Sequence, residues 1–234
     1  MTSQEFFAPF INAGRPFTLK LLGDSITHGV GGTGFEQNGE PITPGYARNP
    51  DGYCWANQLR DYMAEKYNCT VINNACTGTT IEFILERFDD LVSPSDDVIL
   101  CAIGTNNRHQ YLQHAPMRTS DEQAERVYQG ILKLHERFKA AGIPVLFMAN
   151  IPADPENELS QIEYRRLIHM VDVNAQYKRA QKVCGFPLYS FYDTLPVYAA
   201  EHGHTTSYYL CDGLHPNDAG EDAMFELLKE ALGV

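Results

Sequence analysis

Short apolar segments recur along the chain, and longer segments with apolar residues at helical spacing lie between them. The short segments are 17–23, 69–73, 98–103, 144–150 and 186–190. The third, VILCAI, is apolar at every position, which is typical of a strand covered on both faces of a sheet. Strands that alternate with helices predict a parallel sheet with helices on both faces and right-handed crossovers.

The longer segments predict five helices separated from the strands by loops, three of which are long. Helices are expected over 53–67, 79–92, 121–141 and 160–183, and the last begins near Pro216. Their apolar residues return every three or four positions, as one buried face of a helix requires. The long loops are 28–52, 107–119 and 192–211. We expect one α/β domain over 1–234, with three layers around a mostly parallel five-stranded sheet.

The composition narrows the classes of partner. The chain has 18 Lys and Arg against 30 Asp and Glu, a net charge of −12, which disfavours nucleic acid and anionic membrane surfaces. It has no apolar run of the roughly 20 residues that a membrane span needs, so no membrane insertion is expected. Neither charge nor composition decides the oligomeric state.

Two features bear on the cellular compartment. The N-terminus does not resemble a signal peptide, so a cytoplasmic protein is expected, or a secreted one if a leader has been removed. The six cysteines include no C-x-x-C pair and several lie in apolar segments, which favours free thiols over disulfides.

Polar residues follow three predicted strands and precede the last helix. They are the segments Gly23-Asp24-Ser25, Asn73 to Gly78, Gly104 to Asn107, and Asp212 to His215. The carboxyl ends of parallel strands meet at one edge of a sheet, where ligands bind. We therefore expect these four segments to converge there.

The four segments, in this order, resemble the sequence blocks of the SGNH hydrolases, also called GDSL esterases and lipases. Gly23-Asp24-Ser25-Ile26-Thr27 resembles the nucleophile block, and the resemblance extends from 19 to 216. It implies a flavodoxin-like fold and a serine esterase acting on a small-molecule ester without a cofactor. It assigns Ser25 as the nucleophile, His215 as the base and Asp212 as the acid. It also places the oxyanion between the Ser25 and Gly78 N–H groups and the Asn106 amide.

Two positions differ from the pattern of many family members. Asn107 stands where they carry Asp, and Ala75 stands where they carry Gly. Asp24 is adjacent to Ser25, and we assign it a structural role in the turn. Ser25 by itself is also a common turn residue, so its assignment depends on Asp212 and His215.

The proposed roles follow from the chemistry of each residue type. A serine hydroxyl becomes an effective nucleophile when a neighbouring base takes its proton. An imidazole accepts that proton and returns it to the leaving alcohol, while a carboxylate on its far nitrogen fixes the tautomer. Backbone and amide N–H groups stabilise the negative charge of the tetrahedral intermediate.

Several other residues invite a functional interpretation. Gly29 to Gly34 matches G-x-G-x-x-G, but the prolines that follow favour a loop over a dinucleotide site. His202 and His204 lack a third ligand at a typical spacing, so no metal site is expected. Candidate substrate contacts are His28, Arg108 and His109.

The three long loops are expected to form the walls of the pocket. They carry Phe35, Tyr46, Tyr53, Tyr111, Tyr192, Tyr198, Tyr208 and Tyr209. Aromatic rings with polar tips suit small polar esters, which favours acetyl esters of a polar or carbohydrate alcohol. A lysophospholipase or thioesterase remains an alternative, as does a non-catalytic carbohydrate-binding module on the same fold.

Overall fold

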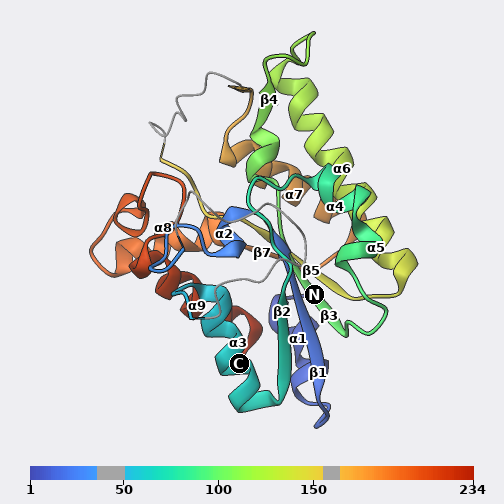
Figure 1. Ribbon diagram of the computed structural model, residues 1–234, viewed down its shortest axis with the longest axis vertical. Helices are drawn as coiled ribbons and strands as arrows, with labels where there is room; N and C mark the ends of the chain where they lie inside the picture. Colours follow the sequence, from blue (N-terminus) through green and yellow to red (C-terminus); the bar gives the residue numbers. More distant parts are fainter. Residues whose placement is uncertain (36–50, 155–163) are drawn as a thin grey trace.

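The central sheet has five strands, all parallel to their neighbours, in the order β2-β1-β3-β5-β7 (Figure 1). The computed structural model describes residues 1–35, 51–154 and 164–234. The strands are β1 (Phe17–Gly23), β2 (Cys69–Asn73), β3 (Val98–Ala102), β5 (Val145–Ala149) and β7 (Leu188–Ser190). The predicted parallel five-stranded α/β fold is confirmed.

Helices cover both faces of the sheet (Figure 1). On one face lie α1 (Ser3–Ile11), α3 (Trp55–Tyr67), α8 (Phe191–Glu201) and α9 (Asp218–Leu232). On the other lie α4 (Ile81–Glu86), α5 (Phe88–Leu91), α6 (Ser120–Ala141) and α7 (Met170–Cys184). Each face has its own buried apolar core, and β3 contributes to both because its successive side chains alternate between them. Each fully buried Leu, Ile or Phe stabilises the fold by about 1.5–3 kcal/mol.

Three short helices lie at or near the carboxyl edge of the sheet. The helix α2 (Ser25–His28) follows β1, and the 3-10 helix η1 (Thr105–Arg108) follows β3. A second 3-10 helix, η2 (Thr206–Tyr209), lies before the last helix. These elements carry or adjoin the polar segments expected at this edge.

Two predicted helices differ from the structure. The helix expected over 79–92 is broken at Arg87, where the backbone leaves helical geometry between α4 and α5. The helix expected over 160–183 begins only at Met170, and 155–163 lie outside the described residues. Before it, β6 (Tyr164–Arg166) pairs antiparallel with β4 (His109–Tyr111). This pairing joins distant segments, so helical periodicity cannot reveal it.

The N-terminus and the loop expected over 192–211 are also more ordered than predicted. Residues 191–201 form α8, with Ser190 accepting a hydrogen bond from the Asp193 N–H at its start. The unpredicted α1 begins with a capping box, in which the side chains of Thr2 and Glu5 each accept from the other's backbone N–H.

The six cysteines are free thiols, four of them buried. Among the described helices none is long and apolar enough to span a membrane.

Candidate active site

Ser25 is the first residue of α2 and follows the turn at the end of β1. Asp24 caps this helix, because its Oδ1 accepts from the Ile26 N–H at 3.1 Å. The turn also requires Gly23, since a Cβ there would lie 2.3 Å from Thr27 Oγ1. Asp24 is fully buried and its Oδ2 accepts from Asn150 Nδ2 at 3.0 Å. These contacts hold the turn that precedes Ser25.

Burial also affects the ionisation of Asp24. Desolvation raises the pKa of this carboxyl above its usual value, and hydrogen bonds from Thr105 and Ile26 offset only part of the effect. Asp24 faces the interior of the protein, not the solvent side of the site.

Asp212 and His215 are held by a tight turn before α9. Asp212 Oδ1 accepts from the backbone N–H groups of Leu214 at 2.9 Å and His215 at 2.8 Å. Its other oxygen, Oδ2, lies 2.7 Å from His215 Nδ1. One carboxylate thus fixes both the backbone of the turn and the orientation of the imidazole.

The imidazole connects this turn to Ser25. His215 Nε2 lies 2.9 Å from Ser25 Oγ, although the two residues are 190 positions apart in the sequence. With Nδ1 facing a carboxylate, the neutral ring carries its proton on Nδ1 and presents a lone pair on Nε2 to the serine hydroxyl. The three residues therefore form one continuous chain of hydrogen bonds.

The environment of Asp212 favours its ionised form. Partial burial opposes ionisation, but hydrogen bonds from the His215 side chain, the His215 backbone and the Leu214 backbone outweigh it. Together they hold the pKa of Asp212 well below its usual value. The carboxylate is thus negative at neutral pH, opposite the ring that would become an imidazolium.

The glycine-rich run 29–34 supports the segment that carries His215. Gly29 has φ +109° and ends α2, so the run follows a short helix and does not begin one. Gly31 has φ +105°, and a Cβ there would lie 2.1 Å from the Pro216 carbonyl oxygen and 3.1 Å from His215 Cβ. The glycines permit close contact between two parts of the backbone, which is a packing role.

Gly78 and Asn106 flank Ser25 through the order of the strands. Gly78 follows β2 and Asn106 follows β3, and β1 lies between these two strands. Gly78 has φ +72°, and Asn106 Nδ2 donates to the Thr79 carbonyl at 2.9 Å. This bond ties the two segments together and uses one of the two amide N–H groups of Asn106.

The three candidate substrate contacts have different positions. His28 is 1% exposed and lies edge-on to Phe35, with ring centroids 5.8 Å apart. Arg108 is 1% exposed, its Nε donates to the Thr105 carbonyl, and burial, then the nearby Arg166, lower its pKa to about 10. Both side chains are thus buried, and neither is among the residues that line the cavity described next.

His109 does line a cavity of about 300 Å³, which also includes Gly78 and Asn106. Burial, followed by the charges of Arg108 and Arg166, lowers the pKa of His109 to about 4. The ring is therefore neutral at pH 7.

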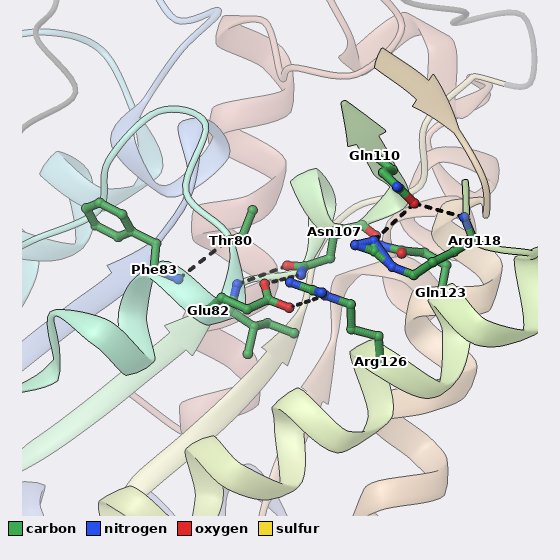
Figure 2. A network of polar contacts seen from close by, with 9 residues as sticks. Thr80, Glu82, Phe83, Asn107, Gln110, Arg118, Gln123 and Arg126 are labelled. Carbon is green, nitrogen blue, oxygen red and sulfur yellow. Dashed lines mark hydrogen bonds and ion pairs between the residues drawn. The ribbon is translucent and has the colours of Figure 1, made fainter. Parts of the chain in front are cut away.

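Most of this cavity's lining was not anticipated from the sequence. The other lining residues are Thr80, Glu82, Asn107, Gln110, Tyr111, His114, Arg118, Gln123 and Arg126. Figure 2 shows several of them as a polar network between α4 and the start of α6. They come from segments with no shared motif, and the only sequence signal was the polar loop 107–119.

Asn107 organises one side of this network (Figure 2). Its Oδ1 accepts from the Ile81 N–H at 3.0 Å, and its Nδ2 donates to Glu82 at 2.8 Å. Glu82 in turn pairs with Arg126 at 2.6 Å. The amide of Asn107 can donate to Glu82, whereas the Asp that many family members carry at this position could not. Ala75, the other departure, is buried, and its N–H donates to Asn73 Oδ1 at 3.0 Å.

The predicted aromatic walls are only partly present. Phe35 and Tyr209 are buried in the core, and Tyr46 lies outside the described residues. Of the seven rings that the structure describes, Tyr111 is the one among the residues that line the cavity. His202 and His204 stack on Tyr198 and Tyr208 respectively. In the described part of the chain, no group of three or more His, Cys, Asp or Glu residues is arranged to bind a metal ion.

The arrangement can be compared with known proteins. The model of the GDSL-like lipase/acylhydrolase family matches residues 21–223. The chain belongs to this family. Like other members of the GDSL family, it is a carboxylic ester hydrolase, and its substrates are small-molecule esters. No curated protein matches the sequence.

Solved structures share the GDSL fold at low sequence identity. A lipase/acylhydrolase from Enterococcus faecalis is 19% identical, with a TM-score of 0.64 over 93% of this chain and 96% of that one. An acetylxylan esterase from Geobacillus stearothermophilus is 15% identical, with a TM-score of 0.63 over 93% and 94%. An α/β hydrolase enzyme from the metagenome of Lake Arreo, Spain, is 19% identical, with a TM-score of 0.65 over 93% and 95%.

Proposed function

We propose that this protein is a serine esterase that cleaves short-chain esters of a polar alcohol. Ser25 is its nucleophile, His215 its general base and Asp212 the carboxylate that orients the base. The observation that carries the proposal is the position of His215, whose two ring nitrogens lie 2.9 Å from Ser25 Oγ and 2.7 Å from Asp212 Oδ2. A base must be within hydrogen-bond distance of the proton that it takes, and here it is.

The reaction proceeds in two halves. Ser25 Oγ attacks the ester carbonyl as its proton passes to His215 Nε2, and the carbonyl oxygen becomes an oxyanion. The C–O bond to the alcohol then breaks, the proton moves from Nε2 to the leaving alkoxide, and an acyl-serine remains. Water then attacks the acyl-serine as its proton passes to Nε2. The bond from the acyl carbon to Ser25 Oγ breaks, the acid leaves, and the proton returns from Nε2 to Oγ.

The oxyanion is stabilised by N–H donors. They are the backbone groups of Ser25 and Gly78 and the second amide N–H of Asn106, whose first N–H is bonded to Thr79. The ionised Asp212 stabilises the imidazolium that forms while the oxyanion exists. Both charges of the intermediate thus have a partner.

The polar cavity beside Gly78 and Asn106 supports the proposed substrate class. Most of the side chains that line it carry an amide, hydroxyl, imidazole or charged group, and these suit a polar substrate group better than a long acyl chain. Two structural neighbours are described as acetylxylan esterases, which agrees with an acetyl ester of a polyhydroxy alcohol as substrate.

The test is hydrolysis of p-nitrophenyl acetate by the wild type and by Ser25→Ala. Loss of a nucleophilic serine costs on the order of a millionfold in kcat. Ser95→Ala is the matched control, because Ser95 is exposed and precedes β3 at the opposite edge of the sheet. A fluorophosphonate probe provides a second readout, since it should label wild type and Ser95→Ala but not Ser25→Ala.

The same assay separates the alternatives. Much faster hydrolysis of octanoyl than of acetyl esters would favour a lysophospholipase or thioesterase. Neither hydrolysis nor labelling would contradict the esterase proposal and favour a binding module.

A further inference from the structure

Two guanidinium groups, Arg118 and Arg126, line the cavity beside the proposed oxyanion site, and they differ in their partners. Arg126 Nε lies 2.6 Å from Glu82, so its charge is neutralised by an ion pair. Arg118 Nη1 donates to a neutral amide oxygen, Gln110 Oε1, at 3.1 Å. No carboxylate of the described residues forms an ion pair with Arg118. Figure 2 shows Arg118 and Arg126 on the same side of the network.

The cavity therefore has an excess of positive charge. Glu82 balances Arg126, His109 is neutral because its pKa is lowered to about 4, and Arg118 remains. This excess is unusual in a protein whose overall net charge is −12. Burial and then the charge of Arg126 lower the pKa of Arg118, and the charges of Glu82 and Glu122 offset only part of this effect, so its environment disfavours the cation. An anion in the cavity would relieve that cost.

Arg118 also has the geometry needed to bind such an anion. A guanidinium carries five N–H donors in a planar fork that matches the two oxygens of a carboxylate. Gln110 Oε1 accepts from both the Arg118 backbone N–H at 3.0 Å and its Nη1, which holds the residue at its backbone and at one guanidinium nitrogen. The side chain is half-buried at the cavity wall, so the remaining donors can reach a ligand there.

We propose that Arg118 determines substrate specificity by binding a carboxylate group carried by the ester substrate. This inference rests on the proposed esterase function, because the cavity shares Gly78 and Asn106 with the proposed oxyanion site. The carboxylate could belong to the acyl part or to the alcohol part of the ester. Either part would present the same group to Arg118, and the substrates chosen for the test distinguish the two possibilities.

The test uses two matched pairs of esters that differ in one negative charge. For the alcohol side the pair is 4-acetoxybenzoate and 4-acetoxybenzamide. For the acyl side it is p-nitrophenyl hemisuccinate and its methyl ester. The quantity compared is the ratio of kcat/KM for the anionic ester to that for the neutral one. We expect the wild type to prefer the anionic member of at least one pair, and that pair identifies the source of the carboxylate.

Arg118→Gln should lower this ratio roughly 10- to 100-fold, as loss of a hydrogen bond to a charged group does. The change should fall mainly on KM, since the carboxylate is bound in the ground state as well as the transition state. Arg118→Lys keeps the charge but not the fork, and should recover part of the ratio. The matched control is Arg137→Gln, which removes one positive charge from an exposed ion pair with Asp89.

Three outcomes would overturn the inference. One is an anionic-to-neutral ratio that is the same in wild type and Arg118→Gln. Another is an equal fall in Arg137→Gln, which would reveal an effect of overall charge. A third is a loss of melting temperature in Arg118→Gln with rates falling equally for both esters, which would indicate a purely structural contact with Gln110. Failure of the wild type to cleave any of the four esters, together with no fluorophosphonate labelling, would instead contradict the esterase function itself.

Discussion

The two halves of the candidate site are built in different ways. The hydrogen-bonded chain of Ser25, His215 and Asp212 is held by short-range bonds within two turns: Asp24 to Ile26, and Asp212 to residues two and three positions later. The polar cavity is held by bonds across the chain, such as Asn107 to Glu82 and Arg126 to Glu82. The first half presents a fixed geometry for one reaction, while the second presents groups whose identity selects a substrate.

The two halves should therefore respond differently to substitution. In the turns, an Asp can be replaced by Asn, whose side-chain oxygen still accepts from the backbone N–H groups that shape the site. In the cavity, each polar side chain is both a potential ligand contact and a support for its neighbours. Substitutions in the first half should therefore affect rate, and many in the second half should also affect folding.

The largest effect that tests this contrast is expected from Asp212→Asn. The amide oxygen can still accept from the Leu214 and His215 N–H groups, so the turn should persist. The amide NH2, however, would face His215 Nδ1 and favour the tautomer with its proton on Nε2, where it cannot accept from Ser25. We expect kcat to fall about 10,000-fold at an unchanged melting temperature. A loss below tenfold, measured with p-nitrophenyl acetate, would contradict the role of Asp212.

Asn106→Ala tests the point where the two halves meet. It removes the amide proposed for the oxyanion and the bond to the Thr79 carbonyl. We expect a fall in kcat of about 100- to 1,000-fold with little change in KM, because the donor acts on charge that develops in the transition state. Steady-state kinetics on a neutral acetyl ester measure both constants. An effect confined to KM would place Asn106 in ground-state binding instead.

Asn107→Asp should affect folding more than rate. Asp can keep the bond to the Ile81 N–H, but it cannot donate to Glu82 and would add a like charge beside it. Burial raises the pKa of Glu82, but hydrogen bonds, including that from Asn107, and Arg126 outweigh burial and lower it. A carboxyl whose pKa is lowered by folding stabilises the fold at pH values above its unfolded pKa. This stabilisation is lost as the pH falls through the folded pKa. The substitution removes part of that contribution, so its cost should be absent at low pH and grow as the carboxyls ionise.

We expect Asn107→Asp to lower the free energy of unfolding by about 1–3 kcal/mol at pH 7. Melting temperatures of variant and wild type at pH 4, 5.5 and 7 measure the difference, which should widen with pH. Asn12→Asp adds the same charge at an exposed position and serves as control. Equal melting temperatures at pH 7 would show that the cavity tolerates a carboxylate there.

The sequence predicted one half of the site much better than the other. Asp212 and His215 are three positions apart, and strand order brings their turn to Ser25, so short motifs were enough. The cavity depends on the pairing of β4 with β6 and on the approach of α4 to Arg126, which join segments far apart. Arg108 could not be placed from the sequence for a related reason: Asn106 lines the cavity, but two positions further along η1 the side chain is buried.

The bond between Ser25 and His215 has a consequence for how the protein acquires activity. It closes a loop of 190 residues, which includes all strands of the central sheet after β1. Such a contact has a large entropic cost and forms only once the intervening chain is ordered. No partly folded intermediate that lacks the C-terminal turn can hydrolyse an ester by the proposed mechanism. The appearance of hydrolysis during refolding would therefore report completion of the whole fold, whereas helical content would rise earlier.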